Sequence, residues 1–410
     1  MKFQKMTCVA SVGFLLGASG FTVAQADGFK PFTDSTLYLQ IRPRYEYVEG
    51  GALKDANAFT NRTILGGKFN GVAGIKGLKA NLEANNVSNF GLMADYGPQE
   101  PGYNKIIDQP QTRITQANLA YTFGGTTFIA GRKMHTFDNQ RFVGHVGWRQ
   151  MPQTFDMIAV ANNSIKGLSL TGAYVSKINR IFAADSSNPQ KDKLDTNSVV
   201  LNGSYAFAKA FKLTGYGYML SSIHDTFGLR ATGSIDAGVK ITYEAEYAIQ
   251  DKASLKENSM GDIQPDHEAD YYKLGFRIKQ SGFIFGADYE VLGQKDGIGG
   301  GAFSTPLATL HAMNGWADKF LGTPVNGLVD TAITAGYINK RFGRFIVIFH
   351  NFESDKGSYD YGTETDVVYA NKLSKNLNLT LKAAFYEQGD DLTNGDINKF
   401  WAMLDYKFNF

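Results

Sequence analysis

The sequence predicts an all-β fold, a transmembrane antiparallel up-and-down β-barrel of about 18 strands with short periplasmic turns and long extracellular loops. Three observations carry this prediction. Apolar and polar residues alternate along many segments, short turns alternate with long polar stretches, and Phe and Tyr are abundant, with 30 and 21 copies. A strand with lipid on one face and water on the other has this period of two, which also explains a mean hydropathy of only −0.23.

The composition of the 410 residues excludes several other classes of protein. A hydrophobic content of 43% at a formal charge of +2 gives enough apolar surface to rule out a disordered chain. Beyond the N-terminus, no run approaches the about 20 apolar residues that a membrane-spanning helix needs. A single cysteine, Cys8, cannot support a disulfide scaffold.

The N-terminus has the features of a signal peptide. Two lysines precede a mostly apolar stretch over residues 6–23, and an Ala-Gln-Ala sequence ending at Ala26 fits a signal-peptidase site. We expect cleavage of residues 1–26, which would remove Cys8 and leave 27–410 as one outer-membrane barrel domain with 39 basic and 39 acidic residues. A transmembrane anchor is the alternative. A net charge of zero gives no support for a nucleic-acid partner.

Segment 36–48 shows the alternation most clearly. One parity carries Leu37, Leu39, Ile41, Pro43, Tyr45 and Tyr47, and the other carries Tyr38, Gln40, Arg42, Arg44 and Glu46. The pattern recurs over 241–250, 273–279, 283–291 and 400–410. A barrel of roughly 16 to 18 strands is too wide for side chains to fill. We therefore expect the apolar parity to face outer-membrane lipid and the charged parity to line a water-filled lumen.

The connections between these segments favour a barrel over a soluble sandwich. Short turns, such as 71–77 and Gly124-Gly125, alternate with longer polar stretches at 90–109, 135–153, 179–195, 251–268, 293–330, 353–363 and 389–396. We count about 18 candidate strands of roughly 9 to 11 residues, with 16 as the alternative, and an even number closes the sheet. Both termini then lie on the periplasmic rim, and the terminal Phe410 is expected to contact the barrel assembly machinery.

Two regions carry a family resemblance. The first contains Gly131-Arg132-Lys133, Asp138-Asn139-Gln140-Arg141-Phe142-Val143-Gly144, Gly147-Trp148-Arg149-Gln150 and Gln153-Thr154-Phe155-Asp156. The second contains Thr305-Pro306-Leu307-Ala308-Thr309-Leu310-His311 and Asn314-Gly315-Trp316-Ala317-Asp318-Lys319-Phe320. In these motifs the sequence resembles the alginate-export-domain porins of Gram-negative bacteria. The resemblance implies an 18-stranded outer-membrane barrel that acts as a passive conduit, with a basic constriction that attracts a polyuronate in the founding exporter.

The predicted inward parity mixes both signs of charge, which departs from such a basic constriction. The candidate pore-lining residues are Arg42, Arg44, Glu46, Arg62, Glu83, Asp156, Lys212, Glu244, Glu246, Lys273, Arg277, Lys279, Asp288 and Glu290. Arg42 and Arg44 would project about 7 Å apart, either as a rung that guides anions or as partners of lumenal acids. Glu244 and Glu246 carry the same two interpretations. Paired carboxylates also serve glycosidases, but an exposed, wet strand face does not suit that chemistry.

Two long stretches are candidates for narrowing the pore. Residues 135–153 hold Asp138, Arg141, Trp148 and Arg149, and we expect them to fold inward, with packing against a neighbouring loop as the alternative. Residues 293–330 include His311 and Trp316, and their 306–320 portion has the apolar spacing of a short amphipathic helix. We expect a gate or partial plug there, or alternatively an extracellular lid.

No motif predicts a cofactor, a metal site or catalysis. The glycines at 297–301 are not followed by Lys-Ser/Thr, the histidines form no i, i+4 pair, and the acidic tip at 390–396 lacks the order of an EF-hand loop. The mature chain also lacks a G-x-S-x-G motif.

The sequence therefore predicts a porin of the bacterial outer membrane that lets small polar or charged solutes, including anions, diffuse passively, without enzymatic activity. Two rival hypotheses stand beside it. One is export of an anionic polysaccharide such as alginate, which requires dominant positive charge at the narrowest point. The other is an outer-membrane hydrolase or adhesin that uses the barrel as a scaffold.

Overall fold

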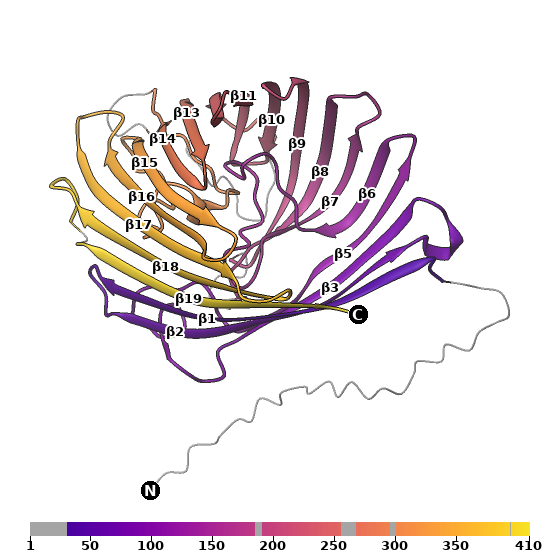
Figure 1. The fold of residues 1–410 in the computed structure, drawn as a ribbon, viewed down its shortest axis with the longest axis horizontal. Coiled ribbons are helices and arrows are strands. Elements are labelled where there is room, and N and C mark those ends of the chain that lie inside the picture. Colours follow the sequence, from indigo (N-terminus) through magenta and orange to yellow (C-terminus); the bar gives the residue numbers. More distant parts are fainter. Residues whose placement is uncertain (1–30, 185–190, 256–267, 296–300, 394) are drawn as a thin grey trace, which may run out of the picture.

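The computed structural model describes residues 31–184, 191–255, 268–295, 301–393 and 395–410. The predicted signal peptide and its cleavage site lie outside these residues. The described chain is almost entirely antiparallel strand, wrapped into a closed barrel (Figure 1). Within these ranges, no helix has the length and apolar character needed to cross a bilayer.

Apart from the short β4, each strand pairs with the next one along the chain, and β1 pairs with β19 to close the barrel. The strands are β1 Asp34–Gly50, β2 Ala56–Asn70, β3 Leu78–Ser88, β4 Ala94–Asp95, β5 Gln111–Phe123, β6 Thr126–Lys133, β7 Thr154–Asn162, β8 Leu168–Asn179, β9 Lys193–Ala208, β10 Phe211–Leu220, β11 His224–Asp236, β12 Lys240–Asp251, β13 Ala269–Gln280, β14 Phe283–Leu292, β15 Leu328–Asn339, β16 Gly343–Glu353, β17 Asp360–Lys372, β18 Leu377–Gln388 and β19 Ile397–Asn409. Because β4 is a two-residue pairing with β2 inside the β3–β5 connection, 18 strands form the barrel wall. The predicted fold and the count of 18 are confirmed.

The two parities of each strand face opposite environments, as predicted. In β1, Leu37 and Ile41 are 42% and 36% exposed on the outer face, whereas Arg42 and Arg44 are buried on the inner face. The same division holds in β12, where Tyr247 and Ile249 point outward and Glu246 points inward. An apolar exterior on a closed sheet suits hydrocarbon, where every backbone donor and acceptor must be paired within the protein.

Short and long connections occupy opposite rims, which also agrees with the sequence. The turns at 124–125, 209–210 and 281–282 lie on the rim that carries the C-terminus. Several strands exceed the expected length, because β1 and β9, with 17 and 16 residues, continue as hairpins beyond the span that a bilayer requires.

Much of the lumen is more apolar than the alternation alone predicts. Buried aromatic and aliphatic side chains of the wall pack there against residues of the long connections, and the cluster includes Phe142, Phe155, Met157, Tyr216, Tyr218, Tyr271, Phe303, Leu307, Phe320 and Phe352. The lumen therefore holds a hydrophobic core of its own, built between the wall and loops that fold inward.

Glycines in the wall let inward tyrosines lie flat against it. A Cβ atom on Gly228 would collide with the ring of Tyr216, whose hydroxyl donates a 2.8 Å hydrogen bond to Oε1 of Glu246. Gly66 accommodates Tyr38 in the same way, and Tyr38 donates a 2.6 Å hydrogen bond to Oε2 of Glu83. At both positions, any larger residue would push the tyrosine ring away from the wall and further into the lumen.

A charge placed on the lipid face should destabilise the barrel. Leu229 lies near the middle of β11 on the outer face and is 59% exposed. We expect Leu229→Arg to lower the free energy of unfolding in lipid vesicles by about 2–4 kcal/mol, because a cation is poorly solvated at the bilayer midplane. Urea titration in vesicles measures the change, with Leu229→Ile as the control. Equal stability of the two variants would contradict a lipid-facing Leu229.

Candidate functional site in the barrel lumen

Three of the long connections fold back into the barrel. Residues 89–110 pack Tyr96 and Ile106, both fully buried, against the inner face of β1 and β2. We name residues 134–153 the first inward loop and the described residues 301–327 the second inward loop. The backbone of Gly144 and Thr309 joins these two loops, since Gly144 N–H donates to the Leu307 carbonyl and Thr309 N–H donates to the Gln140 carbonyl.

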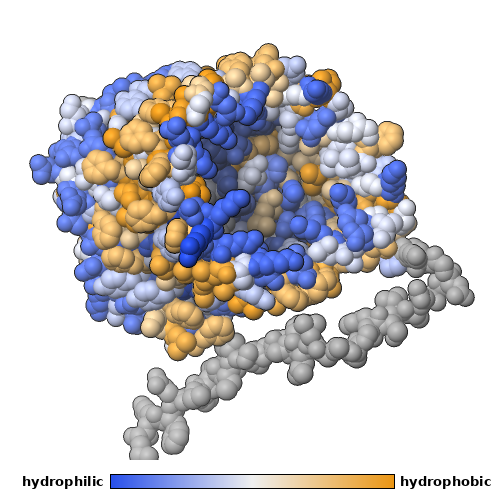
Figure 2. Space-filling view, viewed as in Figure 1, coloured by the Kyte–Doolittle hydropathy of each residue, from blue (hydrophilic) through white to orange (hydrophobic). Residues whose placement is uncertain are grey.

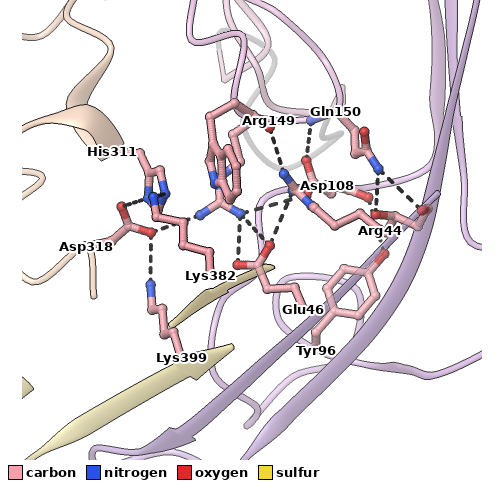
Figure 3. Close-up of polar contacts among 12 residues, drawn as sticks. Arg44, Glu46, Tyr96, Asp108, Arg149, Gln150, His311, Asp318, Lys382 and Lys399 are labelled. Atoms are coloured by element: carbon pink, nitrogen blue, oxygen red, sulfur yellow. Dashed lines mark hydrogen bonds and ion pairs between the residues drawn. The ribbon is translucent and has the colours of Figure 1, made fainter. Parts of the chain in front are cut away.

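A buried ion network connects all three connections to the wall (Figure 3). Arg44 forms ion pairs with Asp108 and, at 3.3 Å, with Glu46. Arg149 of the first inward loop lies 3.0 Å from Glu46 and, through its other terminal nitrogen, 3.0 Å from Asp318 of the second inward loop. The chain of contacts therefore runs from one connection to the next across the lumenal side of β1.

The network continues from Asp318 to β19, which pairs with β1 at the closing seam. The Nζ atom of Lys399 on β19 donates to Asp318 Oδ2 at 2.9 Å, and His311 Nδ1 lies 2.7 Å from Asp318 Oδ1. Arg44, Arg149 and Lys399 balance Glu46, Asp108 and Asp318 one for one. Burial of charge requires such pairing, because an isolated ion would lose its hydration without compensation.

His311 is held in one protonation state by its two neighbours. The Nζ atom of Lys382 lies 2.7 Å from His311 Nε2, and an ammonium group can only donate, so Nε2 accepts and Nδ1–H donates to Asp318. Burial, together with the cations of Lys382 and Arg149, lowers the pKa of His311 to about 3, although Asp318 opposes the shift. For Asp318, burial alone would raise the pKa, but His311, Lys399 and Arg149 outweigh it and hold the pKa well below its ordinary value.

Arg42 and Arg62 lie next to each other on paired strands but differ in their partners. Arg42 donates to the side chain of Gln150 at 2.9 Å and to the backbone carbonyls of residues 147, 148 and 149, so the first inward loop accepts hydrogen bonds from all three nitrogen atoms of its guanidinium group. Arg62 is 7% exposed, and its Nε has no hydrogen-bond partner among the described residues. Its guanidinium group borders a hollow in the lumen instead.

This hollow, which we name the polar hollow, has a volume of about 660 Å³. Figure 2 shows that the middle of the barrel is hollowed and that hydrophilic side chains gather around it. The polar hollow is lined by Thr36, Tyr38, Leu39, Gln40, Arg42, Arg62, Ile64, Lys68, Glu83, Gln116, Met134, His145, Gly147, Pro152, Asp405, Lys407 and Asn409. Because this lining includes residues of both strands of the closing seam, β1 and β19, and of the first inward loop, the hollow extends from the loop toward the short-turn rim.

The wall formed by β11 to β14 carries its own set of ion pairs. Arg230 lies 2.5 Å from Glu244 and 3.4 Å from Glu246, and Lys273 lies 3.3 Å from Glu244. Arg277 pairs with Asp288 across the β13–β14 hairpin. A smaller hollow of about 340 Å³ borders this wall. The charged side chains of this wall therefore form ion pairs with one another, whereas the charge of Arg62 faces the polar hollow.

The structure brings most of the sequence-predicted site residues into the lumen. The residues Arg42, Arg44, Glu46, Arg62, Glu83, Lys212, Glu244, Glu246, Lys273, Arg277, Lys279, Asp288 and Glu290 occupy the inward parity of their strands. Arg44 and Glu46 do not border open water, since both are at most 1% exposed under the inward loops.

Asp156 differs from this set. It shares the parity of Ile158 and Val160, which are 64% and 40% exposed on the outer face, and it pairs with Arg132 at 2.7 Å. The inward positions of β7 hold Phe155 and Met157, because this part of the lumen contains the hydrophobic core. Asp156 is therefore not a lumenal residue.

The residues predicted to constrict the pore all lie in the two inward loops. Arg141 joins them to the wall, with Nε 3.1 Å from Glu290 Oε1 and a 3.0 Å hydrogen bond to Asn314 Oδ1. Asp138 accepts a 2.8 Å hydrogen bond from Asn202 on β9. Trp148, Arg149, His311 and Trp316 meet near β18 and β19.

Sequence reasoning missed several members of the lumen. Lys382 and Lys399 stand on the polar parity of β18 and β19, so the alternation could have identified them. Asp108 and Asp318 lie in long connections without a period of two, and no sequence signal relates them to Arg44 or Arg149. In the described part of the chain, no group of three or more His, Cys, Asp and Glu side chains could hold a metal ion.

Comparisons with known proteins give a consistent result at the level of the fold. No family model matches the sequence, and no curated protein is found by sequence comparison. The structure superposes on Acinetobacter baumannii OccAB2 with a TM-score of 0.72 at 18% identity, covering 93% of this chain and 99% of that one. It also superposes on Pseudomonas aeruginosa OccD3 (OpdP), with a TM-score of 0.67, 15% identity and 93% coverage of both chains. Pseudomonas aeruginosa OpdK with vanillate gives 0.68 at 12% identity, with 93% and 100% coverage.

These neighbours correct the family resemblance inferred from the sequence. They are Occ and OprD porins and not alginate exporters, so the assignment to the alginate-export-domain porins is wrong. The motifs that suggested it lie mostly in the inward loops, where residues such as Trp148 and Arg149 meet local packing and charge requirements. Short loop motifs of this kind do not define a family.

The fold and its two faces define the class of protein. A closed antiparallel barrel of 18 strands, apolar outside and polar within, is an outer-membrane barrel of the porin type. The chain is located in the bacterial outer membrane.

The loop assembly should weaken on acidification through His311. The imidazole has a pKa of about 3 when buried and about 6.5 when the loops are released, so released loops bind the extra proton between these values. The contribution of His311 is therefore complete above about pH 6.5 and is lost as the pH falls toward 3. We expect the thermal midpoint for loss of near-UV circular dichroism to fall between pH 7 and pH 4.5. His311→Gln, which can still accept from Lys382 and donate to Asp318, should show a smaller fall. An identical pH dependence in both proteins would refute this assignment.

Proposed function

We propose that this protein is an outer-membrane porin through which small polar or charged solutes diffuse passively. The proposal rests on the polar hollow. This space inside the barrel is lined by charged side chains of both signs, and Arg62 is one of them. A wall of this composition replaces part of the hydration of a solute as it passes. No step of this function requires catalytic residues, and the superposed structures are porins.

The inward loops support a limit on solute size. They pack a hydrophobic core against wall residues from β7 to β19 and form a balanced ion network beside β1, both of which exclude water. Export of an anionic polysaccharide requires dominant positive charge along its path, whereas the polar hollow is lined by charges of both signs. Small solutes therefore suit the geometry better than a polymer.

Arg62 supports an organic anion as one class of solute. Its guanidinium group lies beside the hollow without a hydrogen-bond partner at Nε among the described residues, and Lys68 and Lys407 border the same hollow. A guanidinium group binds a carboxylate through two parallel hydrogen bonds. The structural neighbour OpdK was crystallised with vanillate, an aromatic carboxylate.

Liposome swelling tests the proposed function directly. Vesicles that contain the purified barrel should swell in solutions of small sugars, amino acids and monocarboxylates, because these solutes fit a hollow of this size. Vesicles that contain heat-denatured protein serve as the control. Impermeability to all three classes of solute would reject the porin function.

Removing the charge of Arg62 should reduce the preference for anions. We expect Arg62→Met to lower the anion-to-cation permeability ratio by roughly two- to five-fold, since a unit charge at the edge of an aqueous hollow contributes about 0.5–1 kcal/mol. Reversal potentials across a salt gradient in planar bilayers measure the ratio. Arg341→Met, which removes an exposed arginine from the β15–β16 turn, changes the net charge equally and is the matched control. The two variants should differ, and equal ratios would refute a role for Arg62.

A further inference from the structure

The three tryptophans of the chain gather around one lysine. The Nζ atom of Lys382 lies 3.6 Å from the ring centroid of Trp316, 4.5 Å from that of Trp148 and 5.4 Å from that of Trp401. We name these three rings the tryptophan cage. A cation within about 6 Å of an aromatic face is attracted by the negative potential of the ring, most strongly by tryptophan.

The three rings come from three separate parts of the chain. Trp148 belongs to the first inward loop and Trp316 to the second, whereas Trp401 lies on β19, directly opposite Lys382 of β18 in the strand register. Lys382 also donates to His311 of the second inward loop. A single ammonium group on the wall therefore contacts both inward loops.

The rings of the cage are also packed against one another through His311. Trp148 and His311 stack with their centroids 4.8 Å apart and their planes inclined by 8°, and Trp401 meets both in an edge-on arrangement. Trp148 and Trp316 both contact the ammonium group of Lys382, so this centre is common to the two inward loops. Loss of the central cation would leave electron-rich faces opposed across an empty space.

The acids nearest to Lys382 are already used by the second inward loop. Trp316 N–H donates to Asp366 Oδ2 at 3.1 Å, and Ala317 N–H donates to Glu364 Oε1 at 2.7 Å. Both acids are fully buried on β17. Asp318 is occupied by Arg149, Lys399 and His311. Lys382 thus makes no close ion pair with these acids, and its ammonium group is held by the cage and by His311.

We propose that Lys382 is the positioning residue that fixes both inward loops against the barrel wall and thereby sets the cross-section of the pore. This inference rests on the proposed porin function for its consequence in transport. The loop attachment itself is independent of that function, and the two can fail separately. The lysine acts as a tethered ammonium group in an aromatic site, and it adds a contact shared by both loops to the ion pairs of Arg141 and Arg149 that also hold them.

The cage provides its own probe, because every tryptophan of the protein belongs to it. We expect Lys382→Met, which keeps the length of the side chain but removes its charge, to shift tryptophan emission to longer wavelength and to increase single-channel conductance in planar bilayers. Lys372→Met, which removes an exposed lysine at the end of β17, should leave both measurements at the wild-type values. Wild-type emission and conductance in Lys382→Met would overturn the proposal.

A chemical rescue distinguishes the positive charge from simple packing. Lys382→Ala leaves a space for a primary alkylammonium ion, and we expect n-butylammonium to return the emission maximum toward the wild-type value. Neutral n-butanol, of similar shape, should not do so. Equal restoration by both compounds, or restoration by neither, would show that the charge at this position does not hold the loops.

A second variant covers the case in which changes at Lys382 prevent folding. Trp316 lies in the second inward loop and not in the wall, so Trp316→Leu should leave barrel formation intact, as judged by heat-modifiable migration on gels. It should still red-shift the emission of the other two tryptophans and raise the conductance. Unchanged emission and conductance in this variant would also overturn the proposal. If the wild-type protein forms no conducting pore but the variants still show the emission shifts, the porin function alone is refuted.

Discussion

Closure of the sheet is the constraint on which the rest of this structure depends. In hydrocarbon, no water is present to pair an exposed backbone N–H or carbonyl, so the first and last strands must find each other. The pairing of β1 with β19 over eleven register positions meets this requirement. Closure also forces each strand to present one face to lipid and the other to an enclosed space. The alternation of the sequence, the polar lumen and the inward direction of Arg42 and Glu246 all follow from it.

A polar lumen in turn allows the long connections to fold inward. A loop that enters an apolar cavity would leave its backbone groups and charges unpaired, whereas this lumen supplies partners at every step. Arg42 receives four carbonyl or amide acceptors from the first inward loop, and Glu364 and Asp366 receive backbone donors from the second. The inner wall is thus partly a docking surface for the loops, and only the charges that the loops leave free can act on a solute.

The sequence predicts the elements better than it predicts their partners. The period of two over 36–48 correctly places Arg42 and Arg44 inside the barrel, because the parity of a strand is a local property. It does not show that Arg44 is buried against Asp108, since the contact joins a strand to a distant loop that has no period.

Asp156 was placed on the wrong face for a related reason. Polarity indicates the inner face only where the lumen is wet, and β7 borders the hydrophobic core with Phe155 and Met157 instead. The length of the two long loops suggested that they fold inward, with packing on a neighbouring loop or an extracellular lid as alternatives, but their common attachment to Lys382 depends on a three-dimensional meeting of β18, β19 and two loops.

The two arginines nearest the polar hollow show how the loops decide which charges remain active. Arg42 and Arg62 face each other in the β1–β2 register and have the same chemistry, so the sequence alone gives them equal roles. The first inward loop lies over Arg42, and its backbone carbonyl oxygens accept hydrogen bonds from the guanidinium group. These acceptors carry no net negative charge. Arg42 therefore keeps its positive charge but cannot form the bidentate hydrogen bonds that a carboxylate would need. Arg62 retains that capacity, because it borders the polar hollow and its Nε has no hydrogen-bond partner among the described residues. In this barrel, the position of a loop thus distinguishes two wall residues of the same chemistry, and a residue that holds the loops in place acts indirectly on which wall charges remain free to contact a solute.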